Sequence, residues 1–342
     1  MTLAQRFRRH ADALDSSAPL YTAFLRGMAD DWEAGGAVRD VCAGWEHAPP
    51  GAVVQLRLLG GLHRLVLTGR APQLLPFYRN LGGTRPPDSA WSAAREVVAE
   101  HVDELRAALD IAPQTNEVGR AAALVVAMFD AATRTGLHRV RLLEVGASAG
   151  LNLLVDQFRI TGQGWEWGPQ SSPVVLEGFV RGVPRAVPIE IVARRGCDLA
   201  PIDPTSPDGR LRLRSFVWPD HVDRHARLDG ALLIAERKPA VVDQAGAGEW
   251  LRVRLTESVA PDVLTVVWHS VVWQYLSDGE RQMAEEVIAR AGPRVVHAAM
   301  EPDPQRPLRL PELTVTTSRD GRPERRLLAE VGYHGDPVRL RA

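Results

Sequence analysis

The chain has 342 residues with a formal net charge of −1, and 45% of them are hydrophobic and 24% charged. This composition is typical of a soluble globular protein with one large domain or two ordinary ones, and the near-zero charge gives no general attraction to nucleic acid or anionic membranes. No apolar run approaches the roughly 18 residues that span a bilayer, and Cys42 and Cys197 form no C-x-x-C pair, so we expect a cytoplasmic protein without a disulfide framework.

Residues 1–135 have the periodicity of helices. Apolar side chains recur at helical spacing in five segments, which are 3–14, 20–32, 53–67, 89–110 and 116–135. Gly60 and Gly61 are a weak point of the third segment, and Gly136 is expected to end the fifth. We predict a helical N-terminal region over 1–135, acting as a lid that selects the substrate.

Residues 136–342 have a different hydrophobic pattern, in which short apolar runs alternate with helical segments. The runs are rich in Val and Ile and predict buried strands at 140–145, 187–193, 238–243, 263–268 and 294–300. Helices are predicted between them at 151–158, 219–237 and 277–292. The alternation predicts an open, doubly wound α/β sheet, and the segments around Asp320-Gly321 predict a closing β-hairpin. The stretch 161–184, dense in Gly, Pro and Trp, is interpreted as an inserted loop.

The turn after the first predicted strand has two interpretations, of which the first is a reactive serine. Residues 146–150 read GASAG, which matches the G-x-S-x-G nucleophile elbow of serine hydrolases and makes Ser148 a candidate nucleophile. Acids and histidines follow in the chain, but almost any chain of this length meets that condition. The helical character of the preceding half and the lack of an HGGG-type oxyanion loop upstream count against a hydrolase.

The second interpretation is a loop that wraps a cofactor. Every residue between Gly146 and Gly150 is small, so the backbone can approach a ligand closely at the start of the following helix. Glu144 stands at the end of the strand, just before the turn. The spacing differs from the dinucleotide fingerprint, because Ser148 replaces its second glycine.

Four motifs carry a resemblance to known families. EVGASAGLNL, with TNEVGR upstream and RRGCDLAP and VWPD downstream, resembles an uncharacterised bacterial family from about Leu14 to Gly335. The part from 137 to about 340 resembles class I S-adenosylmethionine (SAM)-dependent methyltransferases, through EVGASAG above all. The resemblance implies an α/β fold with a Rossmann-like SAM-methyltransferase-type sheet over 136–342, a helical N-terminal region over 1–135, and SAM as cofactor.

The methyltransferase resemblance also implies a set of cofactor-binding residues. The loop and its flanks would hold the methionyl part of SAM through Glu144, Gly146, Ala147, Ser148, Gly150 and Asn152. An acid after the second strand would hold the ribose hydroxyls, and Asp198 matches it by order, several residues beyond the predicted strand end. Asp243, with Gln244 beside it, matches the polar group after the third strand that meets the adenine.

Three further residues are candidates for the reaction itself. His269 follows a buried strand at the end where ligands of α/β sheets bind, so it is a candidate general base, and the alternative is a structural histidine. In TNEVGR, Glu117 and Arg120, with Asn116, are candidate substrate ligands. The alternative for this motif is a helix cap at Thr115 or Asn116.

The sequence thus predicts a SAM-binding, methyltransferase-like enzyme that acts on a small molecule. A serine hydrolase using Ser148 and a non-catalytic ligand-binding protein of the same fold remain as alternatives. The acids and histidines of 217–229 suggest a metal site, but a solvated helix face is favoured, so no metal is predicted. His334 is interpreted as a turn residue. We expect no nucleic-acid or membrane partner, and a homo-oligomer is left open.

Overall fold

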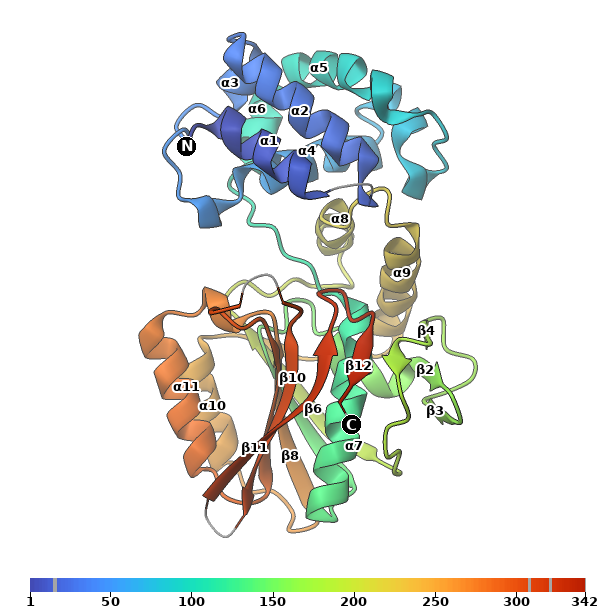
Figure 1. Ribbon diagram of the computed structural model, residues 1–342, viewed down its shortest axis with the longest axis vertical. Coiled ribbons are helices and arrows are strands. Elements are labelled where there is room, and N and C mark those ends of the chain that lie inside the picture. Colours follow the sequence, from blue (N-terminus) through green and yellow to red (C-terminus); the bar gives the residue numbers. More distant parts are fainter. Residues whose placement is uncertain (15–16, 307–308, 320–321, 342) are drawn as a thin grey trace. The chain divides into compact units, whose positions relative to one another are not determined.

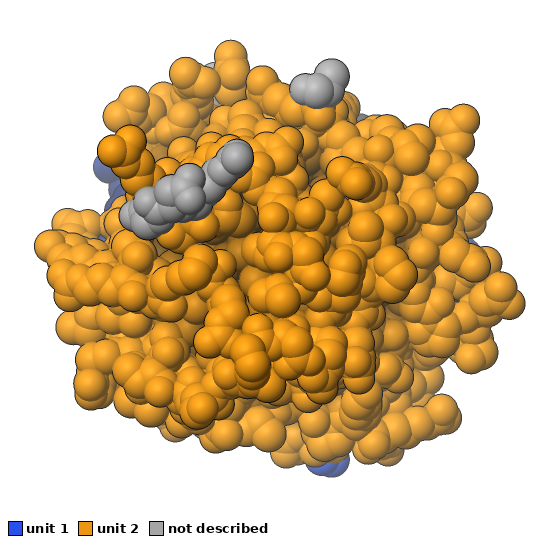
Figure 2. Space-filling model, turned by 90° about the horizontal axis from the view of Figure 1, so that it is seen from below, with its two compact units in different colours: residues 1–115, 207–226 blue, residues 116–206, 227–342 orange. Residues whose placement is uncertain are grey.

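The computed structural model describes residues 1–14, 17–306, 309–319 and 322–341 (Figure 1). The chain forms two compact units, which Figure 2 colours separately: unit 1 comprises 1–115 and 207–226, and unit 2 comprises 116–206 and 227–342. Among the helices of the described residues, none has both the length and the apolar character needed to cross a membrane.

These units differ from the expected division after residue 135 in two respects. Residues 116–135 belong to unit 2, because helix α7 (Ala121–Thr135) packs on the sheet of that unit. Its side chains are buried almost all round, as in a helix that is covered on every side. Residues 207–226 belong to unit 1, where the Asn80 amide donates a hydrogen bond to the Pro219 carbonyl (3.1 Å).

Unit 1 is built from helices. Their bounds are α1 Leu3–Leu14, α2 Pro19–Glu33, α3 Ala37–Val41, α4 Val54–Leu67, α5 Ala90–Glu100, α6 Val102–Ala108 and α8 Pro207–Ser215. Short 3-10 helices lie at Pro50–Ala52, Pro72–Phe77, Arg79–Leu81 and Pro87–Ser89. Helix α9 (Val222–Arg237) begins in unit 1 and continues in unit 2.

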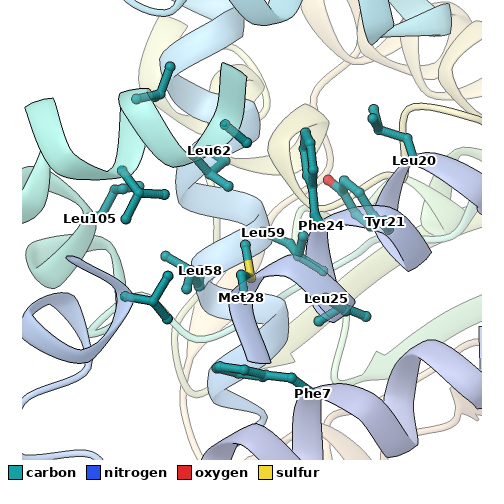
Figure 3. Packing of buried hydrophobic residues seen from close by; sticks show 14 of the residues in the cluster. Phe7, Leu20, Tyr21, Phe24, Leu25, Met28, Leu58, Leu59, Leu62 and Leu105 are labelled. Atoms are coloured by element: carbon teal, nitrogen blue, oxygen red, sulfur yellow. The ribbon is translucent and has the colours of Figure 1, made fainter. Parts of the chain in front are cut away.

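The core of unit 1 lies between α1, α2, α4 and α6 (Figure 3). Its fully buried side chains include Phe7, Phe24, Leu25, Met28, Leu58 and Leu105. Burial of each stabilises the fold by about 1.5 to 3 kcal/mol relative to exposure. The Gly60-Gly61 pair of α4 also lies in this packing, since a Cβ on Gly61 would come within 2.9 Å of the Ala108 Cβ and one on Gly60 would meet Phe216. The pair is therefore a site of close packing.

Unit 2 is organised around a nine-stranded sheet in the order β5-β12-β11-β10-β9-β8-β1-β6-β7. Its strands are β1 Arg139–Val145, β5 Val180–Arg181, β6 Glu190–Asp198, β7 Val242–Gln244, β8 Val263–Ser270, β9 Val295–Glu301, β10 Glu312–Arg319, β11 Arg322–Val331 and β12 Val338–Leu340. Five neighbouring strands, β7-β6-β1-β8-β9, run parallel. When they are numbered by their succession in the chain, their order across the sheet is 3-2-1-4-5. A mostly parallel central sheet with helices confirms the α/β class.

The predicted strands are largely in place. β1, β8 and β9 match the predicted ranges within one or two residues at each end. β6 starts later than predicted and continues to Asp198, because its last residues pair with both β1 and β7. The Arg194 and Arg195 side chains form ion pairs with Asp156 (2.5 Å) and Asp243 (2.7 Å). β10 and β11 pair antiparallel, which confirms the hairpin, and its predicted turn at 320–321 lies outside the described residues.

Two segments differ from the predictions. The predicted helix at 151–158 is a 3-10 helix, Asn152–Gln157, with a kink at Leu154. The predicted loop at 161–184 contains most of a second, three-stranded sheet in the order β3-β2-β4, formed by Arg159–Gly162 (β2), Trp165–Trp167 (β3) and Val175–Glu177 (β4). Both tryptophans meet Phe129 of α7 edge-on, with ring centroids 6.0 and 5.8 Å away. The tryptophans thus anchor the small sheet to α7.

Side-chain alternation separates the two faces of the large sheet. Leu143 and Val145 of β1 and Val267 of β8 pack in one apolar cluster with α10 (Ala247–Thr256) and α11 (Asp278–Arg290). Because successive side chains of a strand point to opposite faces, Glu144 and Trp268 point to the other face. Helix α7 packs on β8, β9 and β10 at that face (Figure 1).

Candidate functional site

The candidate site lies at the carboxyl ends of β1 and β8. From β1 the chain builds the sheet to one side through β6 and β7, and then to the other side through β8 and β9. Ligands of open α/β sheets bind outside the carboxyl ends of the strands at such a switch point. The segments that leave the two central strands there are 146–150 and 271–273.

Strained backbone marks both of these segments. Among the described non-glycine residues of unit 2, Ser148 and Val271 have positive φ values, 54° in each case. Such a conformation costs roughly 1 to 3 kcal/mol per residue, persists only where surroundings impose it, and clusters at functional sites. Hydrogen bonds impose it here, because the Ser148 amide donates to the Asp198 carboxylate (2.9 Å) and the Val271 amide donates to the Met300 carbonyl (2.9 Å).

The amides of the GASAG loop are largely bonded within the protein. The Ala147 amide donates to the Cys197 carbonyl (3.0 Å), the Ser148 amide to Asp198, and the Gly150 amide to the Ala147 carbonyl (2.7 Å). The loop is therefore a rigid turn tied to β6. Its amides do not form an open cradle of donors for an anion.

The two glycines of the loop serve close packing. Gly146 and Gly150 have φ values of +67° and +71°, which L side chains rarely adopt. A Cβ on Gly146 would overlap Val272, and one on Gly150 would lie 2.9 Å from Val242. The loop after β1 thus rests directly on the segment after β8.

Glu144 is a buried carboxyl group on the α7 face, only 2% exposed. Burial raises its pKa to about 8 and the Asp198 charge adds to this, against a hydrogen bond from the Asn152 side chain and the charge of Arg120. The carboxyl group is therefore mostly protonated at pH 7. Its Oε2 atom has no hydrogen-bond partner among the described residues. A buried acid with so large a shift is a marker of functional sites.

Further buried polar atoms around Glu144 also lack partners. Within the described part of the chain, the Ser148 Oγ, Asn152 Oδ1 and Trp268 Nε1 atoms are buried and make no hydrogen bond. Trp268 stands directly opposite Glu144 in the β1–β8 register. Buried polar groups nearly always have a partner, so such a group of atoms indicates a place for water or a ligand. We call Glu144, Ser148, Asn152, Trp268 and Arg120 the Glu144 cluster.

The TNEVGR segment lies beside this cluster. The Asn116 Oδ1 atom accepts a hydrogen bond from the Leu151 amide (2.7 Å), and Asn152 Nδ2 donates to the Glu117 carbonyl (3.3 Å). Glu117 caps a short 3-10 helix, with its Oε1 accepting from the Gly119 amide (3.2 Å). The cap expected at Thr115 or Asn116 is thus at Glu117, and the Asn116 side chain holds the GASAG loop instead.

Arg120 connects three segments of the site. Its Nη1 donates to the Ser270 carbonyl at the end of β8 (3.0 Å), and its Nε donates to the Tyr333 carbonyl (3.0 Å). Its positive charge also acts on Glu144. Of the predicted reaction residues, Glu117 and Arg120 therefore lie together at the Glu144 cluster.

His334 is a residue of the site that the sequence did not indicate. Its Nδ1 lies 3.4 Å from Glu117 Oε2, and its side chain is 46% exposed while that of Glu117 is 4% exposed. The loop that carries it packs on the 117–120 turn without room for a side chain, since a Cβ on Gly335 would overlap the Gly119 carbonyl. The two glycines around His334 in GYHGD suggested a turn, and its partner is visible only in the tertiary structure.

His269 belongs to a second polar group. Its Nδ1 lies 2.7 Å from Glu301 Oε1, its Nε2 lies 2.8 Å from His297 Nε2, and its ring stacks on Trp273 with centroids 3.7 Å apart. Glu301 Oε1 also accepts from the Val272 amide (3.0 Å). Burial lowers the pKa of His297 to about 3, helped by His269 and Arg325, so His297 is neutral at pH 7. We call His269, His297, Glu301 and Trp273 the His269 cluster.

The sheet separates the two clusters. His269 lies two residues beyond Val267 and therefore on the face of α10 and α11, whereas Glu144 points to the face of α7. His269 is 1% exposed, and both of its ring nitrogens have protein partners. The geometry thus agrees with the structural alternative for His269, and the predicted general base is not brought together with Glu117 and Arg120.

The remaining predicted cofactor residues lie at the ends of β6 and β7. Asp198 binds the Ser148 and Ala200 amides (2.9 Å each). Asp243 pairs with Arg195 through both carboxylate oxygens (2.7 Å each) and accepts from Trp250 Nε1 (2.7 Å). These contacts, Arg195 first, lower the pKa of Asp243 to about 2.

Gln244 and a cavity beside the small sheet lie away from the Glu144 cluster. The exposed side chain of Gln244 donates from Nε2 to the Leu199 carbonyl (3.1 Å). A cavity of about 750 Å³ lies beside the small sheet, lined by Arg159, Trp165, Glu166 and Glu177 among others. In the parts of the chain that the structure describes, no three His, Cys, Asp or Glu side chains are grouped to hold a metal ion.

Comparison with known proteins assigns the chain to a family. It belongs to the family described as "Uncharacterized protein conserved in bacteria (DUF2332)", whose model matches residues 4–339. The resemblance to an uncharacterised bacterial family is thereby confirmed. No curated protein and no solved structure matches the chain.

Proposed function

We propose that this member of the bacterial family is a SAM-binding, methyltransferase-like enzyme that acts on a small molecule at the Glu144 cluster. The observation that carries the proposal is the buried Glu144 carboxyl group, whose Oε2 atom has no hydrogen-bond partner among the described residues, at the switch point of a 3-2-1-4-5 parallel sheet. A small-residue turn follows it directly. This order of strand, acid and turn supports a Rossmann-like sheet of the methyltransferase type.

The polar groups of the cluster fit the amino-acid end of SAM. Glu144 Oε2 and Asn152 Oδ1 are buried acceptors without a partner among the described residues, and an ammonium group is a donor. Arg120 supplies positive charge for a carboxylate. The acceptor atoms are covered, so entry of a ligand requires movement of a covering segment.

The fit is weaker at the ends of the second and third strands. Asp198, which the resemblance assigns to the ribose hydroxyls, already accepts hydrogen bonds from the Ser148 and Ala200 amides, one at each carboxylate oxygen. Asp243 supports the proposal least, because Arg195 and Trp250 already occupy its carboxylate. The adenine contact is therefore better assigned to the backbone and to Gln244.

The protein's part in the reaction is to position the reactants. SAM, when bound, supplies a methyl group on a positively charged sulfur, which transfers to a nucleophile held in line with it. Glu144 and Arg120 would fix the amino-acid end, and Ser148 would line the turn without reacting. An acceptor with an N–H or O–H group also needs a group that takes its proton.

A serine hydrolase is the second candidate, because the positive φ of Ser148 resembles the strained turn of a nucleophile elbow. Two observations weigh against it. The Ser148 Oγ atom is buried and has no hydrogen-bond partner in the described residues, whereas a nucleophile needs an adjacent base. The helix that follows an elbow is replaced by a 3-10 helix.

Calorimetric titration of the full chain with SAM and S-adenosylhomocysteine (SAH) tests the proposal. We expect micromolar binding and release of about one proton per ligand at pH 7, because an ammonium group ionises Glu144, whose pKa is about 8. Affinity should rise with pH up to about pH 8 and level off above it. Glu144→Gln should weaken binding at least about tenfold. Glu249→Gln, which removes an exposed acid from α10, is the control and should have no effect.

Each rival has its own outcome. Absence of SAM and SAH binding at millimolar concentration contradicts the proposal. A fluorophosphonate probe that labels the wild type but not Ser148→Ala establishes the hydrolase. Binding without methyl transfer across a panel of small N–H and O–H acceptors favours a non-catalytic ligand-binding protein.

A further inference from the structure

We propose that His334, oriented by the buried carboxylate of Glu117, is the catalytic residue that takes the proton from the acceptor molecule. This inference rests on the proposed function and names the chemistry of its second substrate, a small molecule whose nucleophile carries an N–H or O–H group. It transfers to His334 the acid–base role that the sequence suggested for His269.

The first support is the pairing of a buried acid with a half-exposed histidine. Glu117 Oε2 lies 3.4 Å from His334 Nδ1, and the exposed fractions of the two side chains are 4% and 46%. A carboxylate beside one ring nitrogen fixes the ring orientation and stabilises the imidazolium that forms when the other nitrogen takes a proton. Glu117 is itself held in place by the Gly119 amide (3.2 Å).

The second support is the position of the pair beside the Glu144 cluster. A single guanidinium group, that of Arg120, donates to the Tyr333 carbonyl, one residue before His334, and to the Ser270 carbonyl at the end of β8 (3.0 Å each). The charge of the same group acts on Glu144. His334 and the cofactor-binding carboxyl group are therefore both neighbours of Arg120.

The third support is the rigidity of the loop that carries His334. The Gly335 amide donates to the Gly332 carbonyl (2.7 Å), and the Gly332 amide donates to the Pro337 carbonyl (2.8 Å). Gly119 and Gly335 let this loop and the 117–120 turn approach backbone to backbone. A proton acceptor held in this way keeps its distance from the reacting atoms.

His269 is less suited than His334 to accept a proton from the substrate. His269 is 1% exposed, bonded at both nitrogens, and separated from Glu144 by the sheet. His334 is exposed, and its carboxylate partner lies on the turn that leads into α7.

The proposed step is balanced. The N–H or O–H bond of the acceptor breaks, and its proton goes to Nε2 of His334 while Nδ1 keeps its place at Glu117. The electron pair of the nucleophile bonds to the methyl carbon, whose bond to the sulfonium sulfur breaks with its electrons remaining on sulfur. The products are the methylated acceptor and the uncharged thioether.

NMR titration of His334 tests the inference without an acceptor. The pKa of its ring is measured in the full chain alone, with saturating SAH, and with saturating SAM, and the resonance is assigned from its absence in His334→Gln. SAM and SAH share the groups that meet Glu144 and differ by the methyl group and the positive charge on sulfur. We expect the pKa of His334 to be lower with SAM than with SAH by about half a unit or more, because the added charge opposes protonation nearby.

Glu117→Gln is the second variant. Loss of the carboxylate should lower the pKa of His334 by about one unit. Arg120 and the Asp336–Arg181 pair (3.2 Å) are not changed by this substitution. His138, exposed at the amino end of β1, is the internal control, and its ring resonances should not be changed by either ligand or by the substitution.

The outcomes separate the inference from the function on which it rests. Binding of both ligands with equal His334 pKa values overturns the role of His334 and leaves SAM binding intact. Absence of calorimetric binding overturns the proposed function, and the role of His334 falls with it. An unchanged pKa in Glu117→Gln overturns the pairing itself.

Discussion

The Glu144 cluster is built on β1 and β8 and the His269 cluster on β8 and β9, on opposite faces of the sheet, and they differ in how completely their polar groups are bonded. In the His269 cluster the central ring has a partner at each nitrogen and a stacked indole on its face. Among the described residues, four buried polar atoms of the Glu144 cluster, one each on Glu144, Ser148, Asn152 and Trp268, have no partner, whereas the His269 cluster has one such atom, Glu301 Oε2.

This difference supports placing the proposed ligand at the Glu144 cluster. A bonded cluster fixes the segment after β8, since Glu301 holds both His269 and the Val272 amide. A cluster with unbonded buried atoms costs stability and is retained where a ligand uses those atoms. Chemical type alone does not separate the clusters, because each contains a carboxyl group, buried in Glu144 and partly buried in Glu301.

The largest expected effect tests the claim that Glu144 is a buried acid without an ionic partner that holds it charged. Its pKa is about 8 in the folded protein against an ordinary value of 4.5, so folding stability falls as pH rises from about 4.5 to about 8. Glu144→Gln should be more stable than the wild type at pH 8.5, by up to about 5 kcal/mol. The difference should vanish near pH 4.5, and urea unfolding at several pH values measures it.

Asp243→Asn is the matched control, and it should destabilise the protein, whereas Glu144→Gln should stabilise it. Its depressed pKa of about 2 means that the carboxylate contributes stability above about pH 4, which is lost as pH falls toward 2. The side chain is a quarter exposed, so the variant should lose only about 1 kcal/mol at pH 7. If Glu144→Gln were the less stable protein at pH 8.5, Glu144 would have an ionic partner and the contrast between the clusters would fail.

The contact between the two clusters is tested at Gly146. An alanine there requires a φ of +67° and overlaps Val272, whose own amide donates to Glu301 of the His269 cluster. Gly146→Ala should cost about 2 to 5 kcal/mol in urea unfolding. Gly279→Ala is the control in α11, where a Cβ meets nothing within 4 Å, and it should be neutral or stabilise by up to about 1 kcal/mol. Equal effects of the two substitutions would contradict tight packing at the loop.

The independence of the clusters is tested at Glu301, where the expected change in SAH affinity is small. Glu301→Gln removes the charge that accepts from His269 and from the Val272 amide, and should cost about 1 to 3 kcal/mol of stability. SAH affinity should stay within about twofold of the wild type, because the group lies on the other face of the sheet. A tenfold loss of SAH affinity would show that the two faces act as one site.

Much of the fold follows from local sequence. The Val-rich runs that became β1, β8 and β9 and the small residues of GASAG specify their structure through side-chain shape and backbone freedom, which act over a few residues. The predictions that failed also have a physical reason. Trp165 and Trp167 form a strand because they have Phe129 to pack on, and that partner is distant in the sequence.

Only part of the candidate site could be predicted from the sequence. Glu144 and its turn are consecutive residues, so their proximity is local. Asn116 is linked to the Leu151 amide at the end of that turn, and Glu117 to His334, only by folding. His269 has the residue type and the strand position of a general base, and it lies on the opposite face because of the register between β1 and β8.

By itself, the sequence determined the α/β class, the helical character of the first 115 residues, the hairpin and the turn after Glu144, because these depend on periodicity and on neighbours along the chain. Tertiary structure alone decided the boundary of the units, the small sheet, the partner of His334 and the separation of His269 from Glu144. Each of these depends on which distant segments meet and which face a side chain takes, and strand register and packing set both.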